Sequence, residues 1–442
     1  MPDQLNLLPG VPVEADGSHP YDRSVEMEQS SREAVSKEIH RFEFVALAAM
    51  LMAMAALGMD TMLVALPDIA RTFRVIEEND RQLIVTTYLL GIAAGQPLYG
   101  PLSDRFGRKP VLAAGLAIFV LGSLLAFLAP SFGAILTARI LQGFGAASPR
   151  VLVTAIVRDR FSGRDMARTM SFVMMIFIMV PIFAPTIGAG ILHLLGPWHW
   201  IFVFLLLTAC LVLAWMILRL PETRRDSDRM PISMGSLSRS IVTVVTNRQA
   251  LGYTVAMGFM LGTMMGYLSS TQQIFVDVYG LKEQFPLMFG SLAFVLAVAV
   301  LLNARLVGKL GLRKLSHAAL IGYVAVCILF AVSGFPNHPP LSVFSAYMVA
   351  LFLCFGLMVP NFNALAMEPL GHIAGMASSF VGFYTTAAGA VAGWMVGQAF
   401  NGTVRPLAIG FTILGVLALL TVLTIERGAL LREGKSEIPV KP

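Results

Sequence analysis

Twelve long apolar runs, separated by short polar breaks, divide this chain from end to end. Each run reaches the roughly 20 residues that a helix needs to cross the hydrocarbon core of a bilayer. Of the 442 residues, 56% are hydrophobic and only 13% are charged, too few to cover the surface of a water-soluble fold. The sequence therefore predicts an all-α membrane protein with twelve transmembrane helices. These spans leave no room for a soluble catalytic domain, which argues against an enzyme.

The polar breaks place the span boundaries and divide the chain into two halves. Spans are predicted at residues 43–69, 81–102, 110–130, 132–157, 167–192, 199–220, 248–276, 284–307, 315–335, 341–367, 371–400 and 405–426. The longest break, 221–247, is expected to be a cytosolic linker between two pseudo-symmetric six-helix bundles, 42–220 and 248–426. Residues 1–41 are polar and unpatterned, so we expect a disordered cytosolic tail there, and a second cytosolic tail at 427–442.

Lysine and arginine residues gather in alternate loops, which orients the chain. With a cytosolic N-terminus, most basic residues fall in inside loops and tails; the outside loops hold only Arg71, Arg74, Arg81, Lys282 and Arg405. Basic residues accumulate on the cytoplasmic side of membrane proteins. This bias predicts a multi-pass membrane protein with both termini in the cytosol, and the expected location is the bacterial inner membrane. It also accounts for the net charge of +6 without a nucleic-acid partner.

The loop after the second span carries the most specific motif. Residues 100–109 read Gly-Pro-Leu-Ser-Asp-Arg-Phe-Gly-Arg-Lys, and the motif positions are Gly100, Leu102, Asp104, Arg105, Gly107, Arg108 and Lys109. Glycine tolerates unusual backbone torsions in a tight turn, and an aspartate can meet a helix N-terminus or an arginine. Such a charge cluster is expected to latch one conformation and release in the other. Residues 308–314 form a degraded repeat of this loop in the second half.

This loop resembles the G-x-L-x-D-R-x-G-R-[KR] signature of the major facilitator superfamily. Leu220-Pro-Glu-Thr223, at the end of the sixth span, is also similar to many members. The resemblance implies two six-helix bundles around a central cavity that work by alternating access.

Two charges lie deep within the predicted spans. Asp60 in the first span and Arg139 in the fourth are each about seven residues, or roughly 10 Å, from the outer helix end. An intramembrane charge costs several kcal/mol unless it is paired or hydrated, and the equal depth permits contact between the two side chains. A carboxylate in a cavity of changing polarity is a natural proton carrier, because desolvation and a nearby cation change its proton affinity in opposite senses. A static structural pair is the alternative interpretation.

The sequence around these charges resembles that of the drug:proton antiporters with twelve spans. Residues 60–67, Asp-Thr-Met-Leu-Val-Ala-Leu-Pro, are similar to their first-helix signature. Residues 139–143, Arg-Ile-Leu-Gln-Gly, are similar to a fourth-helix motif whose arginine assists proton transfer. Residues 181–190 are close to the antiporter signature G-P-x-x-G-G, with the candidates Pro181, Pro185, Gly188 and Gly190. Ala184 and Ala189 depart from that signature, which weakens the inference on transport direction. Residues 368–379 resemble the bicyclomycin/chloramphenicol-resistance (Bcr/CflA) branch.

Polar, aromatic and methionine side chains within the spans are candidates for the substrate cavity. They are Met62, Tyr88, Gln142, Tyr253, Tyr267, Asn361 and Tyr384, together with Gln96. The chain has 25 methionines, which supply a soft surface suited to varied ligands. Packing is the alternative for each of these residues. Arg150, in the inner half of the fourth span, is interpreted as a snorkelling or gate residue.

Together, the residues and the resemblance imply a proton-coupled exporter of hydrophobic small molecules or drugs, with phenicol- or bicyclomycin-like antibiotics as examples. An exporter of a native metabolite, such as an amino acid or siderophore, and an uptake symporter are the alternatives. One deep acid predicts about one proton per cycle, which favours neutral or monocationic substrates. The sequence has no phosphate-binding loop, so we expect no cofactor, no metal, and a proton gradient as the energy source. The expected partners are the substrate, protons and the bilayer, and the resemblance implies a monomer.

Overall fold

The computed structural model describes residues 40–224, 234–334, 337–428 and 430–431. Within these ranges the chain is helical and contains no strand. Twelve helices are long and apolar enough to cross a membrane, which confirms the predicted fold class and the predicted number of spans. Most of the two expected tails, and residues 225–233 of the expected linker, lie outside the described ranges.

Six spans form the first half of the chain. Their helices are α2 (Arg41–Asp60), α3 (Leu66–Thr72), α4 (Leu83–Phe106), α5 (Arg108–Phe127), α6 (Phe132–Arg160), α7 (Gly163–Leu195) and α8 (His199–Arg219). The first span is broken, because α2 ends at Asp60 and a 3₁₀ turn, Leu63–Ala65, leads into α3. Pro67 has no amide hydrogen to donate and lies in the first turn of α3. The prediction of one continuous helix over 43–69 missed this break.

The second half begins with α9 (Met234–Thr246), the described part of the expected linker. The spans that follow are α10 (Arg248–Gln272), α11 (Phe285–Leu310), α12 (Leu312–Val332), α13 (Leu341–Met367), α14 (Ala374–Gln398) and α15 (Arg405–Ile425). A π-helical turn, Gln273–Val278, extends α10, and a 3₁₀ turn, Glu368–Ile373, joins α13 to α14. π-Helical turns of this kind often occur at functional sites.

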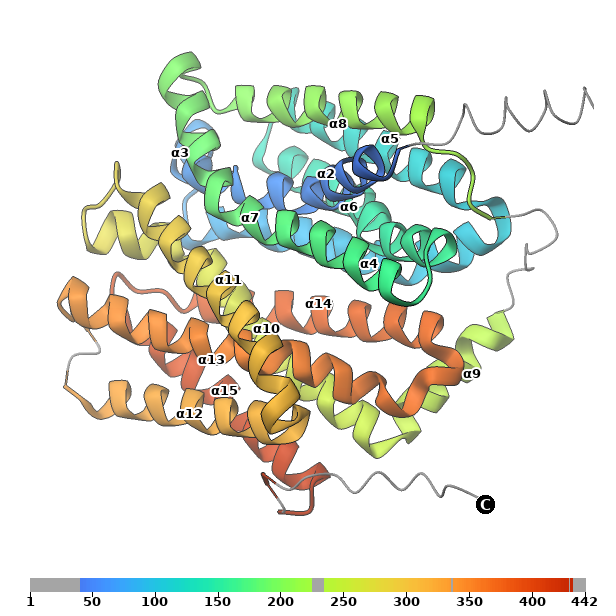
Figure 1. The fold of residues 1–442 in the computed structure, drawn as a ribbon. Coiled ribbons are helices and arrows are strands. Elements are labelled where there is room, and N and C mark those ends of the chain that lie inside the picture. Colours follow the sequence, from blue (N-terminus) through green and yellow to red (C-terminus); the bar gives the residue numbers. More distant parts are fainter. Residues whose placement is uncertain (1–39, 225–233, 335–336, 429, 432–442) are drawn as a thin grey trace, which may run out of the picture.

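The two halves form separate helix bundles, with α2–α8 above and α10–α15 below in Figure 1. Two helix pairs make the most extensive contacts between the bundles, α4 with α14 and α7 with α11. In the first pair, Gln96 Nε2 donates a hydrogen bond to Thr386 Oγ1 at 3.1 Å. These pairs join the second span to the eleventh and the fifth to the eighth. The two contacts are equivalent under the internal repeat, because the second and fifth spans of the first half correspond to the eighth and eleventh spans of the second half.

The two ends of the molecule differ in chemistry. We call the end with the loops 100–109 and 308–314 the basic end, and the opposite end the far end. In Figure 1 the far end, with α3, lies at the left, and the basic end, with α9, lies at the right.

Candidate functional site

Asp60 lies at the break in the first span, as the last residue of α2. It is 1% exposed, and neither of its carboxylate oxygens has a hydrogen-bond partner among the described residues. A buried ionised carboxylate without a partner is strongly unfavourable. The surroundings of Asp60 therefore favour the uncharged form of its carboxyl group in this conformation.

Arg139 of α6 is fully buried and contacts the same end of α2. Its guanidinium donates to the carbonyl oxygens of Gly58 at 2.8 Å and Ile84 at 3.2 Å. It also lies 4.2 Å from the centroid of the Tyr88 ring, a cation–π contact. The sequence permitted a contact between the side chains of Asp60 and Arg139, but the structure has no ion pair between them. Arg139 instead binds the main chain two residues before Asp60.

Two residues predicted to line the cavity support Arg139 instead. Gln142 accepts a hydrogen bond of 2.5 Å from Arg139 and donates one of 2.7 Å to Ser123 of α5. The Tyr88 hydroxyl donates to the carbonyl oxygen of Ala55 at 2.9 Å. The spacing of Arg139 and Gln142, three residues apart, places both on one helix face. This spacing was the signal in the sequence for their contact.

Gly188 brings α7 into close contact with the helix of Asp60. A Cβ atom at Gly188 would lie 2.3 Å from the carbonyl oxygen of Thr61, so only glycine fits there without a shift. On the same helix, the carbonyl oxygen of Ile182 would lie 2.9 Å from a Cβ atom at Gly290 of α11. The helix that carries the antiporter-like motif therefore contacts both the region of Asp60 and the second bundle.

The other residues of that motif make fewer close contacts. A Cβ atom at Gly190 would meet no atom within 4 Å. Pro181 and Pro185 lie inside α7, where each removes one main-chain donor. Within the motif, Gly188 is thus the glycine whose lack of a side chain is required by packing.

The predicted loop 100–109 is helical except at Gly107, since it consists of the end of α4 and the start of α5, and it forms a charge cluster within the first bundle. Gly107 turns the chain with φ 98°, a conformation that suits glycine. Arg108 pairs with Asp104 at 2.8 Å and with Asp159, near the end of α6, at 2.9 Å. Asp104 also lies 3.8 Å from Arg224. The predicted latch residues Asp104 and Arg108 are therefore brought together.

Glu222, just after α8, completes this cluster, although the sequence did not single it out as a site residue. Its carboxylate accepts hydrogen bonds from the amides of Arg108 at 2.9 Å and Lys109 at 3.0 Å. These amides begin α5, so Glu222 satisfies donors that the helix itself cannot. Arg105 makes a different contact, with its guanidinium 5.0 Å from the Phe106 ring. Gly100 faces α14, where a Cβ atom would lie 3.3 Å from Ser379 Oγ.

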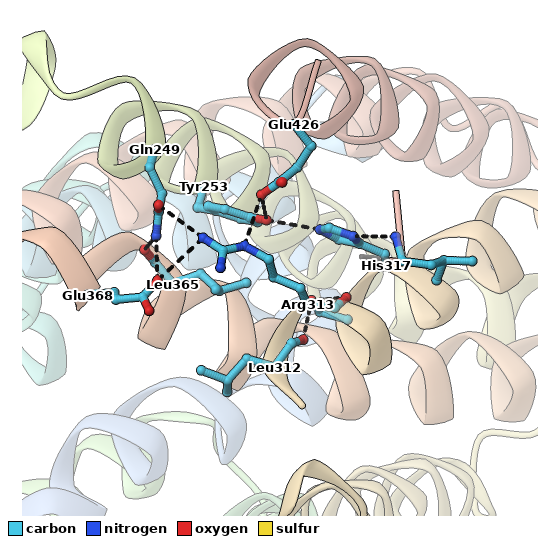
Figure 2. Close-up of polar contacts among 10 residues, drawn as sticks. Gln249, Tyr253, Leu312, Arg313, His317, Leu365, Glu368 and Glu426 are labelled. Atoms are coloured by element: carbon cyan, nitrogen blue, oxygen red, sulfur yellow. Dashed lines mark hydrogen bonds and ion pairs between the residues drawn. The ribbon is translucent and has the colours of Figure 1, made fainter. Parts of the chain in front are cut away.

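The degraded repeat in the second half builds a related cluster (Figure 2). Gly311 has φ 78° and, like Gly107, directly precedes a helix. Arg313 pairs with Glu426 at 3.2 Å and with Glu368 at 3.5 Å. Glu426 follows the twelfth span as Glu222 follows the sixth. The repeat thus conserves a turn, an arginine and a carboxylate beyond the last helix of each bundle.

Tyr253, predicted to line the cavity, belongs to this second cluster. Its hydroxyl donates to Glu426 at 2.7 Å and lies 2.9 Å from His317 Nε2 (Figure 2). The amide of Leu431 donates to His317 Nδ1 at 3.3 Å. Because Nδ1 accepts, the neutral imidazole carries its proton on Nε2 and donates to Tyr253.

Side-chain amides join the two bundles at the far end. Gln273 donates to Asn79 at 2.9 Å, and Gln82 donates to the carbonyl oxygen of Gly397 at 3.0 Å. Gln82 also donates to Gln273, and Arg81 forms an ion pair with Asp277. Each contact joins the start of the second span to the end of the seventh or eleventh. These contacts hold the two bundles together and close the far end. The sequence analysis did not identify them.

A cavity of about 460 Å³ lies between the two bundles toward the basic end. Its walls come from α4, the start of α5, α6, and the first turns of α14. Three motif residues line it, Gly100, Asp104 and Arg108, and so does Arg150, which the sequence analysis interpreted as a snorkelling or gate residue. Gln96 also lines the cavity, as the sequence predicted.

The other predicted cavity residues do not line this space. Met62, Tyr88, Gln142, Tyr253 and Asn361 are buried in packing or hydrogen-bond networks, and Tyr384 is partly exposed elsewhere. Tyr267 borders a separate void of about 10 Å³ in the second bundle. Polar character alone does not tell which face of a helix meets the cavity, so a role of these residues in substrate binding stays a prediction.

Two helix bundles that are joined at one end and line a cavity toward the other have the architecture of a membrane carrier. The family model of the Major Facilitator Superfamily matches residues 48–393. The chain therefore belongs to this superfamily, and it is a multi-pass membrane protein.

Bacterial relatives agree with this assignment. The MFS-type transporter YdgK of Bacillus subtilis is 31% identical over 81% of this chain and 89% of its own length. A "Bicyclomycin resistance protein homolog" of Haemophilus influenzae is 29% identical over 83% of this chain and 92% of its own length. "Multidrug resistance protein MdtL" of Escherichia coli is 27% identical over 84% and 92%, respectively.

A solved structure supports the fold. The crystal structure of a D-xylose-proton symporter superposes with a TM-score of 0.67 at 15% identity. The match covers 90% of this chain and 100% of the symporter chain. At this identity the likeness concerns the fold alone.

Proposed function

We propose that this protein is a proton-coupled exporter of hydrophobic small molecules or drugs. The observation that carries the proposal is the cavity of about 460 Å³ between the bundles, opposite a far end that is tied shut. We take the basic end as the cytosolic face of the bacterial inner membrane, with both termini inside, because lysine and arginine favour that side. In this conformation the carrier loads its substrate from the cytosol.

Asp60 is the proposed proton carrier. Both oxygens of its carboxyl group are buried without a partner, an arrangement in which the protonated form is the stable one. When the far end opens, Asp60 takes up a proton from outside, and it releases that proton inward after the carrier has switched. Arg139 positions Asp60 through the Gly58 carbonyl oxygen. The proton gradient supplies the energy, and the proposal needs no cofactor.

Export, rather than uptake, is supported by two observations. The names of two relatives state bicyclomycin resistance and multidrug resistance, and the α7 motif packs directly on the helix of Asp60. An exporter of a native metabolite would share every feature described and differ only in its ligand. Because one chain contains both bundles, we propose that a monomer is sufficient for transport.

The test measures accumulation of an antibiotic panel in pump-deficient bacteria. Cells would express wild type, Asp60→Asn, or the control Asp68→Asn, whose exposed carboxylate lies in α3. We expect lower accumulation with wild type and Asp68→Asn, and no reduction with Asp60→Asn or after addition of a protonophore. If no compound accumulates less with wild type, although all three proteins reach the membrane, drug export is wrong. The search for a substrate would then move to native metabolites.

A further inference from the structure

We propose that the cavity at the basic end binds the anionic group of an amphipathic substrate, such as a carboxylate, with Arg150 as its main contact. This inference rests on the proposed function, because it takes this cavity as the one that loads the transported molecule. It adds a substrate class, an amphipathic anion, and a residue that selects it.

A polar stripe on α6 faces the cavity. Arg150, Thr154 and Arg158 all line it, and their spacing of four residues places them on one helix face. The two arginines are about 12 Å apart along the helix, and Arg150 lies about 15 Å from the end of α6 at Arg160. Arg158 is therefore near the entrance, whereas Arg150 lies within the part of the helix that the membrane surrounds.

The charges that line the cavity do not balance. Three arginines and one aspartate line it, and two of these, Arg108 and Asp104, pair with each other at 2.8 Å. Neither Arg150 nor Arg158 has an ion-pair partner in the part of the chain that the structure describes. An intramembrane cation without a counter-charge is unfavourable. An anionic ligand beside Arg150 would supply that counter-charge.

The opposite wall of the cavity also favours an anion. It is formed by the first turn of α14, including Ala374 and Gly375. The residue before that turn, Ile373, offers no side chain to cap the helix. The start of an α-helix carries the positive end of its dipole. Positive potential therefore comes from two independent elements, one in each bundle.

The remaining lining accommodates the body of such a ligand. Pro97, Val151 and Met376 contribute apolar walls. Gln96 adds a buried Oε1 atom that has no hydrogen-bond partner among the described residues. Because this oxygen accepts hydrogen bonds and a carboxylate has none to donate, only a hydroxyl or amide elsewhere on the ligand could bond to it. The arginines and the apolar walls together favour an amphipathic monoanion. A monocation, one of the two substrate classes that the count of intramembrane acids favoured, would meet two unpaired arginines here.

The test compares three probes that share one carbon skeleton, namely 4-phenylbutyrate, 4-phenylbutyramide and 4-phenylbutylamine. Calorimetric titration would measure their binding to the purified full chain in phosphatidylcholine nanodiscs. We expect wild type to bind the anion at least about tenfold more tightly than the amide or the amine, because a charged hydrogen bond contributes that much. Arg150→Gln should remove this preference, and Arg150→Glu should favour the amine. Arg164→Gln, which changes an exposed arginine outside the cavity, should behave as wild type.

Several results would overturn the inference. Equal binding of the three probes, no saturable binding of the anion, or unchanged anion binding by Arg150→Gln each contradicts it. A lipid headgroup is the other source of an anion, so the titration is repeated with phosphatidylglycerol in the nanodiscs. Loss of 4-phenylbutyrate binding to wild type in those nanodiscs would assign the site to lipid and overturn the substrate assignment. Binding needs neither a proton gradient nor antibiotic export, so this result is independent of the efflux test.

Discussion

The guanidinium of Arg139 donates a hydrogen bond of 2.8 Å to the carbonyl oxygen of Gly58, two residues before Asp60 in α2. The buried cation thus binds the main chain beside the carboxyl group and leaves the carboxyl oxygens without a partner. A direct ion pair would hold Asp60 in its ionised form. The observed arrangement instead positions Asp60 and leaves its carboxyl group available for a proton.

Replacing Arg139 by methionine should destabilise the first bundle. The change removes the donor to Gln142 Oε1, which is fully buried and would lose its partner. We expect a loss of about 1–3 kcal/mol in the free energy of unfolding, the usual effect of leaving a buried polar group unsatisfied. Thermal unfolding of the purified protein in detergent measures it. Arg164→Met, at an exposed position, is the control and should change stability by no more than about 0.5 kcal/mol. Equal stability of the two variants would contradict this role.

Two glycines of the α7 motif should respond differently to alanine. Gly188→Ala places a Cβ atom 2.3 Å from the Thr61 carbonyl oxygen, whereas Gly190→Ala meets no atom within 4 Å. Overpacking of this kind costs about 1–3 kcal/mol, so we expect Gly188→Ala to displace α7 from α2 and reduce export at least about tenfold. Gly190→Ala should export as wild type does. Accumulation assays at equal expression compare them, and equal activity would refute the importance of this contact.

A covalent link across the far end should block transport. Arg81 and Asp277 form an ion pair between the bundles, so Arg81→Cys with Asp277→Cys can be joined by a short bis-methanethiosulfonate reagent. The three native cysteines, Cys210, Cys327 and Cys354, are first replaced by alanine. We expect the linked protein to stop exporting and to recover after reduction. Asp68→Cys with Arg71→Cys, a pair within α3, is the matched control. Export by the linked far-end variant would show that this end need not open.

The span count could be predicted because a membrane-crossing helix requires a minimum apolar length, and the apolar runs along the sequence show that length directly. The equal depth of Asp60 and Arg139 was predicted from the helical rise, and the structure places Arg139 against the main chain beside Asp60. The face that each side chain presents could not be predicted, since it depends on helix rotation and tilt. Tyr88 and Gln96 illustrate this point. Both lie in α4, yet Tyr88 packs on Arg139, whereas Gln96 bonds to α14 and lines the cavity.

The contacts between the bundles could not be predicted from the sequence either. The amides of Asn79, Gln82 and Gln273 lie near helix ends, where polar residues are ordinary. The packing of the start of the second span on α14 and on the end of α10 brings these residues together. The break at Asp60 was likewise missed, although Pro67 was a signal for a new helix start.

Asp60→Asn should separate proton coupling from substrate movement. Asparagine has the shape of a protonated aspartate but cannot release a proton, so the variant should bind and exchange substrate while losing its response to a pH gradient. Proteoliposomes test this with an antibiotic that the wild type exports. A pH gradient should drive transport by wild type, and the rate for Asp60→Asn should fall to that of empty liposomes. Exchange of labelled for unlabelled antibiotic, without a gradient, should continue in both proteins. If Asp60→Asn still accumulates antibiotic against its gradient when the pH gradient is applied, the proton is carried elsewhere. If exchange is lost as well, Asp60 contributes to the switch between conformations rather than to coupling alone.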